Sequence, residues 1–151
     1  MKLYLCFSMM LAFFSVNIAQ TTNKENICQM KAKEQWRVYA DSGRYNEAID
    51  ILLDSIQKSK HKDQKKYYWH IGQLYACIDE YDTAIDYLKK SAGFFDTFID
   101  REWRLYYRGT IAFLKKDKRK LYHYTDKLWN KHSAYNYSNA CRLKALYENF
   151  E

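Results

Sequence analysis

The sequence contains no proline and only four glycines among its 151 residues. Both residue types interrupt helices: proline lacks the backbone N–H, and glycine has the most backbone freedom to lose. Charged residues, which suit the solvent side of helices, make up 28% of the chain. This composition favours a helical protein and argues against a fold built around many proline- and glycine-bearing turns.

Long apolar runs are lacking except at the N-terminus. Met1-Lys2 supplies one positive charge, Leu3–Val16 is almost entirely apolar, and the next ten residues turn polar. This is the order of regions in a secretory signal peptide, and the run is shorter than the ~20 apolar residues of a membrane span. Cleavage after Ala19 or Gln20 departs from the A-x-A pattern, so an uncleaved short anchor is the alternative. We expect a signal peptide over residues 1–20, an exported protein, periplasmic or secreted, and no stable membrane span after cleavage.

Local signatures of catalysis are also lacking. The sequence has no HExxH, no G-x-S-x-G and no glycine-rich phosphate loop, and its four histidines are scattered. The acidic cluster Asp79–Asp82 lies between two expected helices, where carboxylates cap helices and complement their dipoles. We therefore expect no catalytic residue, no metal site and no cofactor, and a protein that is not an enzyme.

Cysteine is too sparse for a disulfide framework. After residue 20 the chain keeps Cys28, Cys77 and Cys141, an odd number without a C-x-x-C motif. The simplest interpretation is three small buried side chains, and a partial disulfide or a reactive thiol are the alternatives. The remaining residues, 21–151, are the length of a single domain that needs no metal or disulfide for stability.

What the sequence does contain is a repeat. YNEAIDILLDSI at Tyr45–Ile56 returns as YDTAIDYLKKSA at Tyr81–Ala92, thirty-six residues later. In both copies the apolar residues fall at steps of three and four, as one face of a helix requires. Each copy follows another helical stretch after a short break, DSGR or DEYD. The unit is therefore a helix, a tight turn and a second helix, which buries its apolar faces only when neighbouring units stack on it.

A third, less regular unit follows. REWRLYYRGTIAFLKK at Arg101–Lys116 places Gly109 thirty-seven residues after Gly72, and Asp117–His132 continues at helical spacing without the Tyr-x-x-Ala-Ile signature. A last helix fits the polar-faced cap that repeat arrays need. We expect an all-α fold of antiparallel helix pairs stacked as a short right-handed solenoid, with units over about 25–60, 62–97 and 98–132 and a capping helix over 134–150.

In these residues the chain resembles the tetratricopeptide repeat (TPR) family. IGQLY at Ile71–Tyr75 followed by YDTAIDYL at Tyr81–Leu88 matches the family pattern closely, and GRYNEAIDILL at Gly43–Leu53 matches its second half. Three features depart from it: Trp36 stands where the family has a small residue, the closing proline is missing, and the spacing exceeds the usual ~34 residues. Parallel first helices would place Cys28 and Cys77 at opposite ends, too far apart for a disulfide.

The resemblance implies a binding surface. Members of the family bind extended peptides in the concave groove lined by their first helices. On the matching positions, the surface for a protein or peptide partner would comprise Lys33, Arg37, Lys66, Trp69, Gln73, Trp103, Tyr106 and Thr110. Trp69 and Trp103 fit equally well as residues packed between units. The basic-and-asparagine clamp that some members place on a chain terminus is not reproduced.

Positive charge gathers in the third unit. Residues 101–132 carry ten basic and three acidic side chains, whereas residues 21–100 have a net charge of −1. The candidate patch for an anionic partner is Arg101, Arg104, Arg108, Lys115, Lys116, Lys118, Arg119 and Lys120. Basic residues interleaved with aromatics are typical of nucleic-acid sites, but export argues against nucleic acid as the partner. The alternative for Lys115–Lys120 is a solvated turn and helix start.

Three functions are compatible with these features. The first is a non-enzymatic adaptor or scaffold of the cell envelope that binds a protein or peptide through its concave face. The second is a small inhibitor or immunity-type protein that occludes a toxin or hydrolase. The third is a binder of an anionic envelope polymer or lipid through the basic third unit, which salt would weaken.

Overall fold

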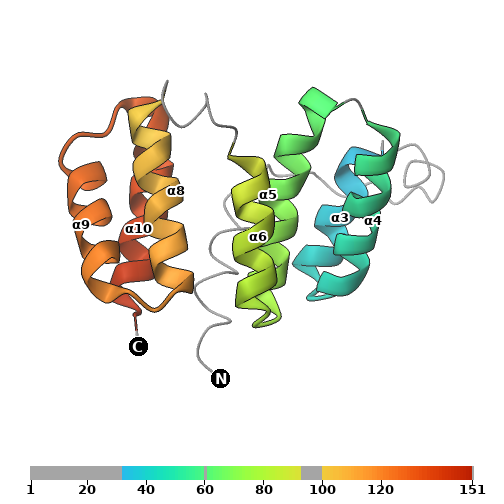
Figure 1. The fold of residues 1–151 in the computed structure, drawn as a ribbon, viewed down its shortest axis with the longest axis horizontal. Helices are drawn as coiled ribbons and strands as arrows, with labels where there is room; N and C mark the ends of the chain where they lie inside the picture. The colour runs from blue at the N-terminus through green and yellow to red at the C-terminus, as the bar shows by residue number, and fades with distance from the viewer. Residues whose placement is uncertain (1–31, 60, 93–99, 151) are drawn as a thin grey trace, which may run out of the picture.

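The computed structural model describes residues 32–59, 61–92 and 100–150, and the side chains of all of these except 32–34 and 61–63. The predicted signal peptide and Cys28 lie outside the described residues. The described part is all helical, as predicted: seven α-helices and one 3-10 turn. The helices pack in consecutive antiparallel pairs that stand in a row (Figure 1).

Three helix pairs and a cap make up this row. The first pair is α3 (Ala32–Asp41) and α4 (Tyr45–Lys58), and the second is α5 (His61–Cys77) and α6 (Tyr81–Ser91). The third pair is α8 (Arg101–Leu114) and α9 (Lys118–Trp129). The turn η2 (Ala134–Asn136) then leads into α10 (Tyr137–Glu148), which packs against both α8 and α9. The predicted third unit and capping helix are therefore confirmed as helical elements.

The same turn joins the two helices of every pair. Gly43, Asp79 and Lys116 all have left-handed backbone conformations, with φ of 76°, 63° and 56°. The next residue in each turn donates its N–H to a carbonyl five residues back, at 2.9, 3.0 and 2.9 Å. This is the Schellman motif that ends helices. The three units therefore repeat the same backbone geometry, although only the first turn has a glycine, the residue that this conformation favours.

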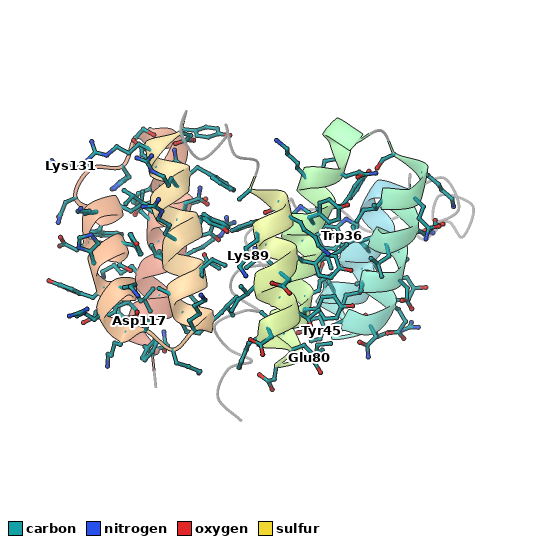
Figure 2. The ribbon with its side chains drawn as sticks, viewed as in Figure 1. Trp36, Tyr45, Glu80, Lys89, Asp117 and Lys131 are labelled. Carbon is teal, nitrogen blue, oxygen red and sulfur yellow. The ribbon has the colours of Figure 1, made fainter. Side chains whose placement is uncertain are left out.

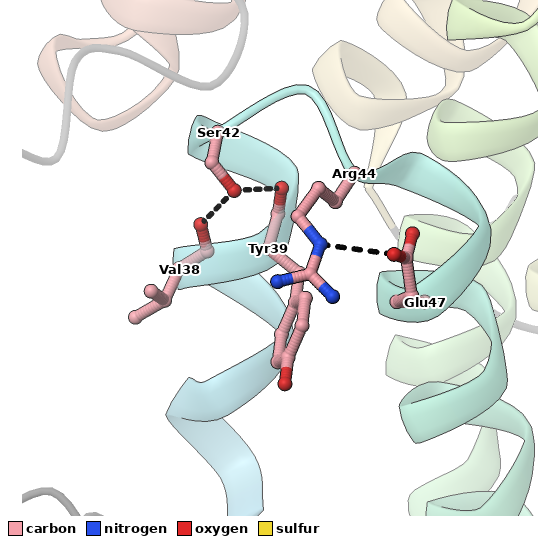
Figure 3. A network of polar contacts seen from close by, with 5 residues as sticks. All are labelled: Val38, Tyr39, Ser42, Arg44 and Glu47. Carbon is pink, nitrogen blue, oxygen red and sulfur yellow. Dashed lines mark hydrogen bonds and ion pairs between the residues drawn. The ribbon is translucent and has the colours of Figure 1, made fainter.

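Side-chain contacts stabilise the residues around the first turn (Figure 3). The Ser42 hydroxyl donates to the carbonyls of Val38 and Tyr39, both at 2.9 Å, and so adds to the backbone hydrogen bonds that these carbonyls accept near the end of α3. Arg44 pairs with Glu47 at 2.9 Å and lies over the Tyr39 ring at 4.5 Å. In the second turn, Asp79 was expected as a helix cap. It instead adopts the left-handed conformation and accepts a hydrogen bond from the Tyr81 hydroxyl, while Glu80 precedes α6.

Two hydrophobic clusters form the core. One lies among α3, α4 and α5, and the other extends from α5 and α6 to α8, α9 and α10. Tyr75 on α5 contacts both clusters and stacks on Tyr87 with ring centroids 5.4 Å apart. A shared wall of this kind is how stacked repeats bury faces that one helix pair alone leaves exposed.

Candidate functional site

The first helices of the three pairs were predicted to present the binding surface. Arg37 on α3 and Lys66 on α5 are exposed. The Arg37 guanidinium lies 5.3 Å from the Trp36 ring centroid, and the Lys66 ammonium lies 5.1 Å from that of Tyr67. Lys33 belongs to α3, but its side chain is outside the described set. Two of the predicted cations therefore stand at the surface of neighbouring helices, each supported by an aromatic ring.

Aromatic residues occupy the junction between α5 and α8. The Trp69 ring lies 5.8 Å from Trp103 and 6.4 Å from Tyr107, and Trp103 stacks on Tyr107 at 5.5 Å with an angle of 12° between the planes. All three side chains are half-buried. Trp69 and Trp103 are therefore packed between units, as the alternative interpretation had it, and they keep part of their surface open to solvent.

Three predicted groove residues are buried, so the prediction that they line an open surface is wrong. Gln73 is 8% exposed, Tyr106 is 3% exposed and Thr110 is fully buried. The Thr110 hydroxyl donates to the Tyr106 carbonyl at 3.0 Å within α8, and Gln73 pairs with His70 at 3.2 Å. Burial raises the pKa of Tyr106 to about 12, against the opposing effect of the Arg142 charge on α10. Packing of α5 and α10 against α8 covers this face, which the sequence pattern did not reveal.

The basic residues of the third pair do not form one patch. Arg101 stands at the start of α8 and Lys115–Lys120 at the other end of the α8–α9 hairpin, and Arg104 and Arg108 lie along α8 between them. A helix of 14 residues spans about 21 Å. Figure 2 shows Lys131 and Asp117 at opposite ends of this hairpin. The predicted patch is thus divided between two ends.

Several residues of the cluster at Lys115–Lys120 contact other side chains of the protein. Asp117 accepts a hydrogen bond from the Lys120 backbone N–H at 3.0 Å and pairs with the Lys120 ammonium at 2.8 Å. These contacts hold the pKa of Asp117 below its usual value. Lys116 lies over the rings of Tyr81 and Phe113, and Lys118 over that of Phe150. Much of this cluster forms the turn and the start of α9, as the alternative interpretation for these residues proposed.

A pocket of about 330 Å³ opens at the other end of the hairpin. We call it the end pocket; it is lined by Asp100, Arg101, Glu102, Leu105, Lys127, Lys131, Ser133 and Asn136. The Glu102 carboxylate accepts hydrogen bonds from the Ser133 N–H at 3.0 Å and from its hydroxyl at 2.7 Å. Those bonds lower the pKa of Glu102. Lys127 and Lys131 were counted in the basic region, but the sequence did not show that they meet Arg101 here.

Histidine and cysteine contribute packing. His70 lies 4.6 Å from the Trp36 ring, and burial lowers its pKa. Cys77 and Cys141 are free and half-buried, and burial together with nearby Asp79 raises the pKa of Cys77 to about 12, so its thiol is protonated at neutral pH. Within the described ranges, no three His, Cys, Asp or Glu side chains gather as ligands of a metal would.

None of the described helices combines the length and the apolar character needed to cross a membrane.

Comparison with known proteins gives one significant likeness. Over 89 residues, 58% of this chain, the sequence is 33% identical to outer dynein arm-docking complex subunit 4 of Xenopus laevis. The matched part is only 16% of that protein's length. No family model matches the chain, and no solved structure matches it significantly. The segment of 89 residues is what this chain shares with a protein named as part of a docking complex.

Proposed function

We propose that this protein is a TPR-like, non-enzymatic adaptor that binds an extended segment of a partner protein along its first helices. The observation that carries the proposal is the Schellman turn at Gly43, Asp79 and Lys116. Because every pair turns in the same way, the first helices α3, α5 and α8 occupy equivalent places in the row. Repeat proteins use such a row as a continuous binding surface.

The side chains on this row indicate the chemistry of the partner. Arg37 and Lys66 are exposed cations, and Trp69, three residues after Lys66 on α5, forms with Trp103 a partly open aromatic surface. Cations attract carboxylates and orient an approaching chain, while aromatic surfaces supply most of the binding energy in protein interfaces. The expected partner segment therefore combines acidic residues with one or two apolar anchors.

The similarity to a docking-complex subunit supports a role in holding proteins together. It covers a minor part of that protein, so neither its assembly nor its cellular place is carried over to this chain.

The N-terminal sequence supports an exported protein of the cell envelope. The test is the mass of the mature chain isolated from its native host. A chain that starts after Ala19 or Gln20 is the expected result, and a chain that retains residues 1–20 would contradict signal cleavage.

Peptide selection tests the binding function. The folded protein is panned against a random-peptide phage library, and selected peptides are measured by fluorescence anisotropy. We expect acidic peptides with aromatic or aliphatic anchors, whose affinity falls about tenfold or more in the double variant Arg37→Glu/Lys66→Glu.

The control for this experiment is Lys58→Glu/Lys90→Glu, which makes the same change of charge on the second helices α4 and α6, where both lysines are exposed. Selection of no specific peptide, or equal losses in the two double variants, would overturn the proposed surface.

A further inference from the structure

We propose that the end pocket is a second docking site, which takes an acidic segment of a partner protein. The site lies between the start of α8 and the end of α9, with η2 closing one side. Its volume, about 330 Å³, is at the lower end of the range for specific binding pockets. The proposal does not depend on the surface formed by the first helices.

Three cations converge on the end pocket from separate parts of the chain. Arg101 comes from the first turn of α8, Lys127 from the last turn of α9, and Lys131 from the segment that follows α9. All three are exposed, and none forms an ion pair with a carboxylate of the described residues. Their positive charges repel one another in the free protein, so an anion in the pocket would relieve that repulsion.

The two carboxylates of the end pocket are already engaged. Asp100 accepts hydrogen bonds from the backbone N–H groups of Glu102 and Trp103, both at 2.9 Å, and so caps α8. Glu102 holds Ser133, which ties the segment after α9 to the start of α8. These carboxylates shape the wall of the pocket through hydrogen bonds to N–H and O–H donors.

The mixed lining favours an acidic peptide over a compact anion. A phosphate group concentrates its charge at one point, where Asp100 and Glu102 would repel it. An extended acidic segment instead distributes its carboxylates, which lets each one approach Arg101, Lys127 or Lys131 separately. Leu105 adds an apolar contact in the same pocket, so an aliphatic side chain between the acidic residues would add affinity.

The end pocket is distinct from the aromatic junction. Arg101 and Trp103 are two residues apart on α8, which places their side chains about 200° apart around the helix axis. Trp103 faces Trp69 on α5, whereas Arg101 lines the pocket with residues of α9 and the segment after it. One partner segment on the first helices therefore leaves the end pocket accessible.

Anisotropy with labelled model peptides tests the site. The probes are a blocked hexapeptide Glu-Glu-Leu-Glu-Glu-Leu and its analogue with serine in place of leucine, measured at low ionic strength. We expect saturable binding of both, with the leucine peptide about threefold tighter or more. The triple variant Arg101→Glu/Lys127→Glu/Lys131→Glu should weaken the leucine peptide by about tenfold or more.

The matched control is Lys115→Glu/Lys118→Glu/Arg119→Glu, which changes the charge equally at the other end of the same hairpin. We expect less than about a threefold change there, because such distant charges act only through a screened field. The variant Arg37→Glu/Lys66→Glu should also leave this binding unchanged, which separates the end pocket from the proposed surface on the first helices. Far-UV circular dichroism confirms that each variant is folded.

Backbone amide shifts provide an independent readout. Titration with the leucine peptide should move the signals of Ser133 and Asn136, which line the pocket. Three outcomes would overturn the proposal: equal losses in both triple variants, no movement of those two signals, or binding of a single-stranded oligouridine or of phosphatidylglycerol vesicles that matches the peptide and is lost in the same variant. The last outcome would identify a general polyanion surface.

Discussion

The first two helix pairs and the third place different residues at the same positions of the second helix. Counted from the left-handed residue of each turn, three equivalent positions carry a small, a large and a small side chain in the first two pairs, and a large, a small and a large one in the third. The three sets are Ala48, Leu52 and Ser55; Ala84, Leu88 and Ser91; and Leu121, Thr125 and Leu128, all buried except Ser55, which is half-buried. The third set is the bulkier one, and the additional helix α10 packs against both α8 and α9. The Thr125 hydroxyl donates to the Leu143 carbonyl of α10 at 3.4 Å, so the third pair keeps its fold with a core of different composition.

The glycine of the first helix also approaches a different neighbour in the second pair than in the third. A Cβ added at Gly72 would lie 2.7 Å from Leu88 of its own pair, whereas one added at Gly109 would lie 2.5 Å from Leu143 of α10. Trp36, seven residues before Gly43, holds the same place in the first pair. The residue at this position therefore contacts a different helix in each of the last two units, and only those two units have a glycine there.

The second and third pairs also differ in how far one equivalent residue of the second helix is exposed, because the third pair is the last in the row. Ile85 in the second pair is 6% exposed and belongs to the hydrophobic cluster that the second pair shares with the third. Tyr122, its equivalent in the third pair, is 53% exposed and contacts Tyr147 of α10. A tyrosine suits a half-covered place because its ring packs while its hydroxyl remains in water.

The largest expected change in stability comes from replacing Trp36 by glycine, the residue that the second and third pairs have at the equivalent position. Trp36→Gly should lower the free energy of unfolding by about 3–5 kcal/mol, because it empties a buried site in the cluster of α3, α4 and α5. Urea unfolding followed by circular dichroism measures it. A loss below about 1 kcal/mol would show that the first pair collapses onto the space and regains the regular geometry.

Exchange of the equivalent residues Ile85 and Tyr122 tests the end effect. Ile85→Tyr should cost about 1–3 kcal/mol, because a larger side chain enters a packed site. Tyr122→Ile should stay within about 0.5 kcal/mol, as is usual at exposed positions. Equal changes in the free energy of unfolding would contradict the difference in environment.

Alanine at the two close contacts compares their rigidity. Gly72→Ala should cost about 1–2 kcal/mol, because its Cβ would also lie 3.0 Å from the Ala84 carbonyl, which is backbone. Gly109→Ala should cost less than about 1 kcal/mol, because the three atoms nearest to its Cβ all belong to the side chain of Leu143, and alanine favours the helix. Thermal unfolding of both variants measures the difference; a reversed order would place the more rigid contact in the third pair.

Substitutions at the left-handed residues of the turns should change the stability less, and one of them should increase it. Lys116→Gly should stabilise the protein by about 0.5–1 kcal/mol, because glycine adopts the left-handed conformation without strain. Gly43→Ala should destabilise it by about 1 kcal/mol for the same reason. If Lys116→Gly were destabilising in urea unfolding, the contacts of the lysine with Phe113 and Tyr81 would outweigh the backbone strain.

The smallest effect concerns His70, which packs between the first two pairs. Burial lowers its pKa below the usual ~6.5, so the folded protein favours the neutral ring. Stability from this group is present above pH 6.5 and is lost as the pH falls from 6.5 through the folded pKa. His70→Gln should flatten the decline in stability over that range, and NMR titration of the ring protons measures the pKa. A folded pKa at or above 6.5 would contradict the burial effect.

Periodicity alone predicted the helices and their order, because steps of three and four identify a helix face wherever it packs. The same reasoning found the third pair through Gly109 and the spacing of its apolar residues, despite the missing signature. Burial around the helix was harder to predict: the family resemblance placed Gln73, Tyr106 and Thr110 on an open surface, and neighbouring helices cover them. Matching these positions to the family pattern therefore did not identify which side of α5 and α8 faces solvent.

The sequence by itself determined the helical class, the pairing of helices and the concentration of positive charge after residue 100. Only the tertiary structure decided how that charge is distributed: Lys115–Lys120 at one end of a hairpin, and Arg101 with Lys127 and Lys131 at the other. The physical reason is that a local pattern governs the hydrogen bonds and apolar face of one helix, whereas an antiparallel turn brings the start of α8 beside the end of α9. Residues some thirty positions apart in the sequence thereby line one pocket.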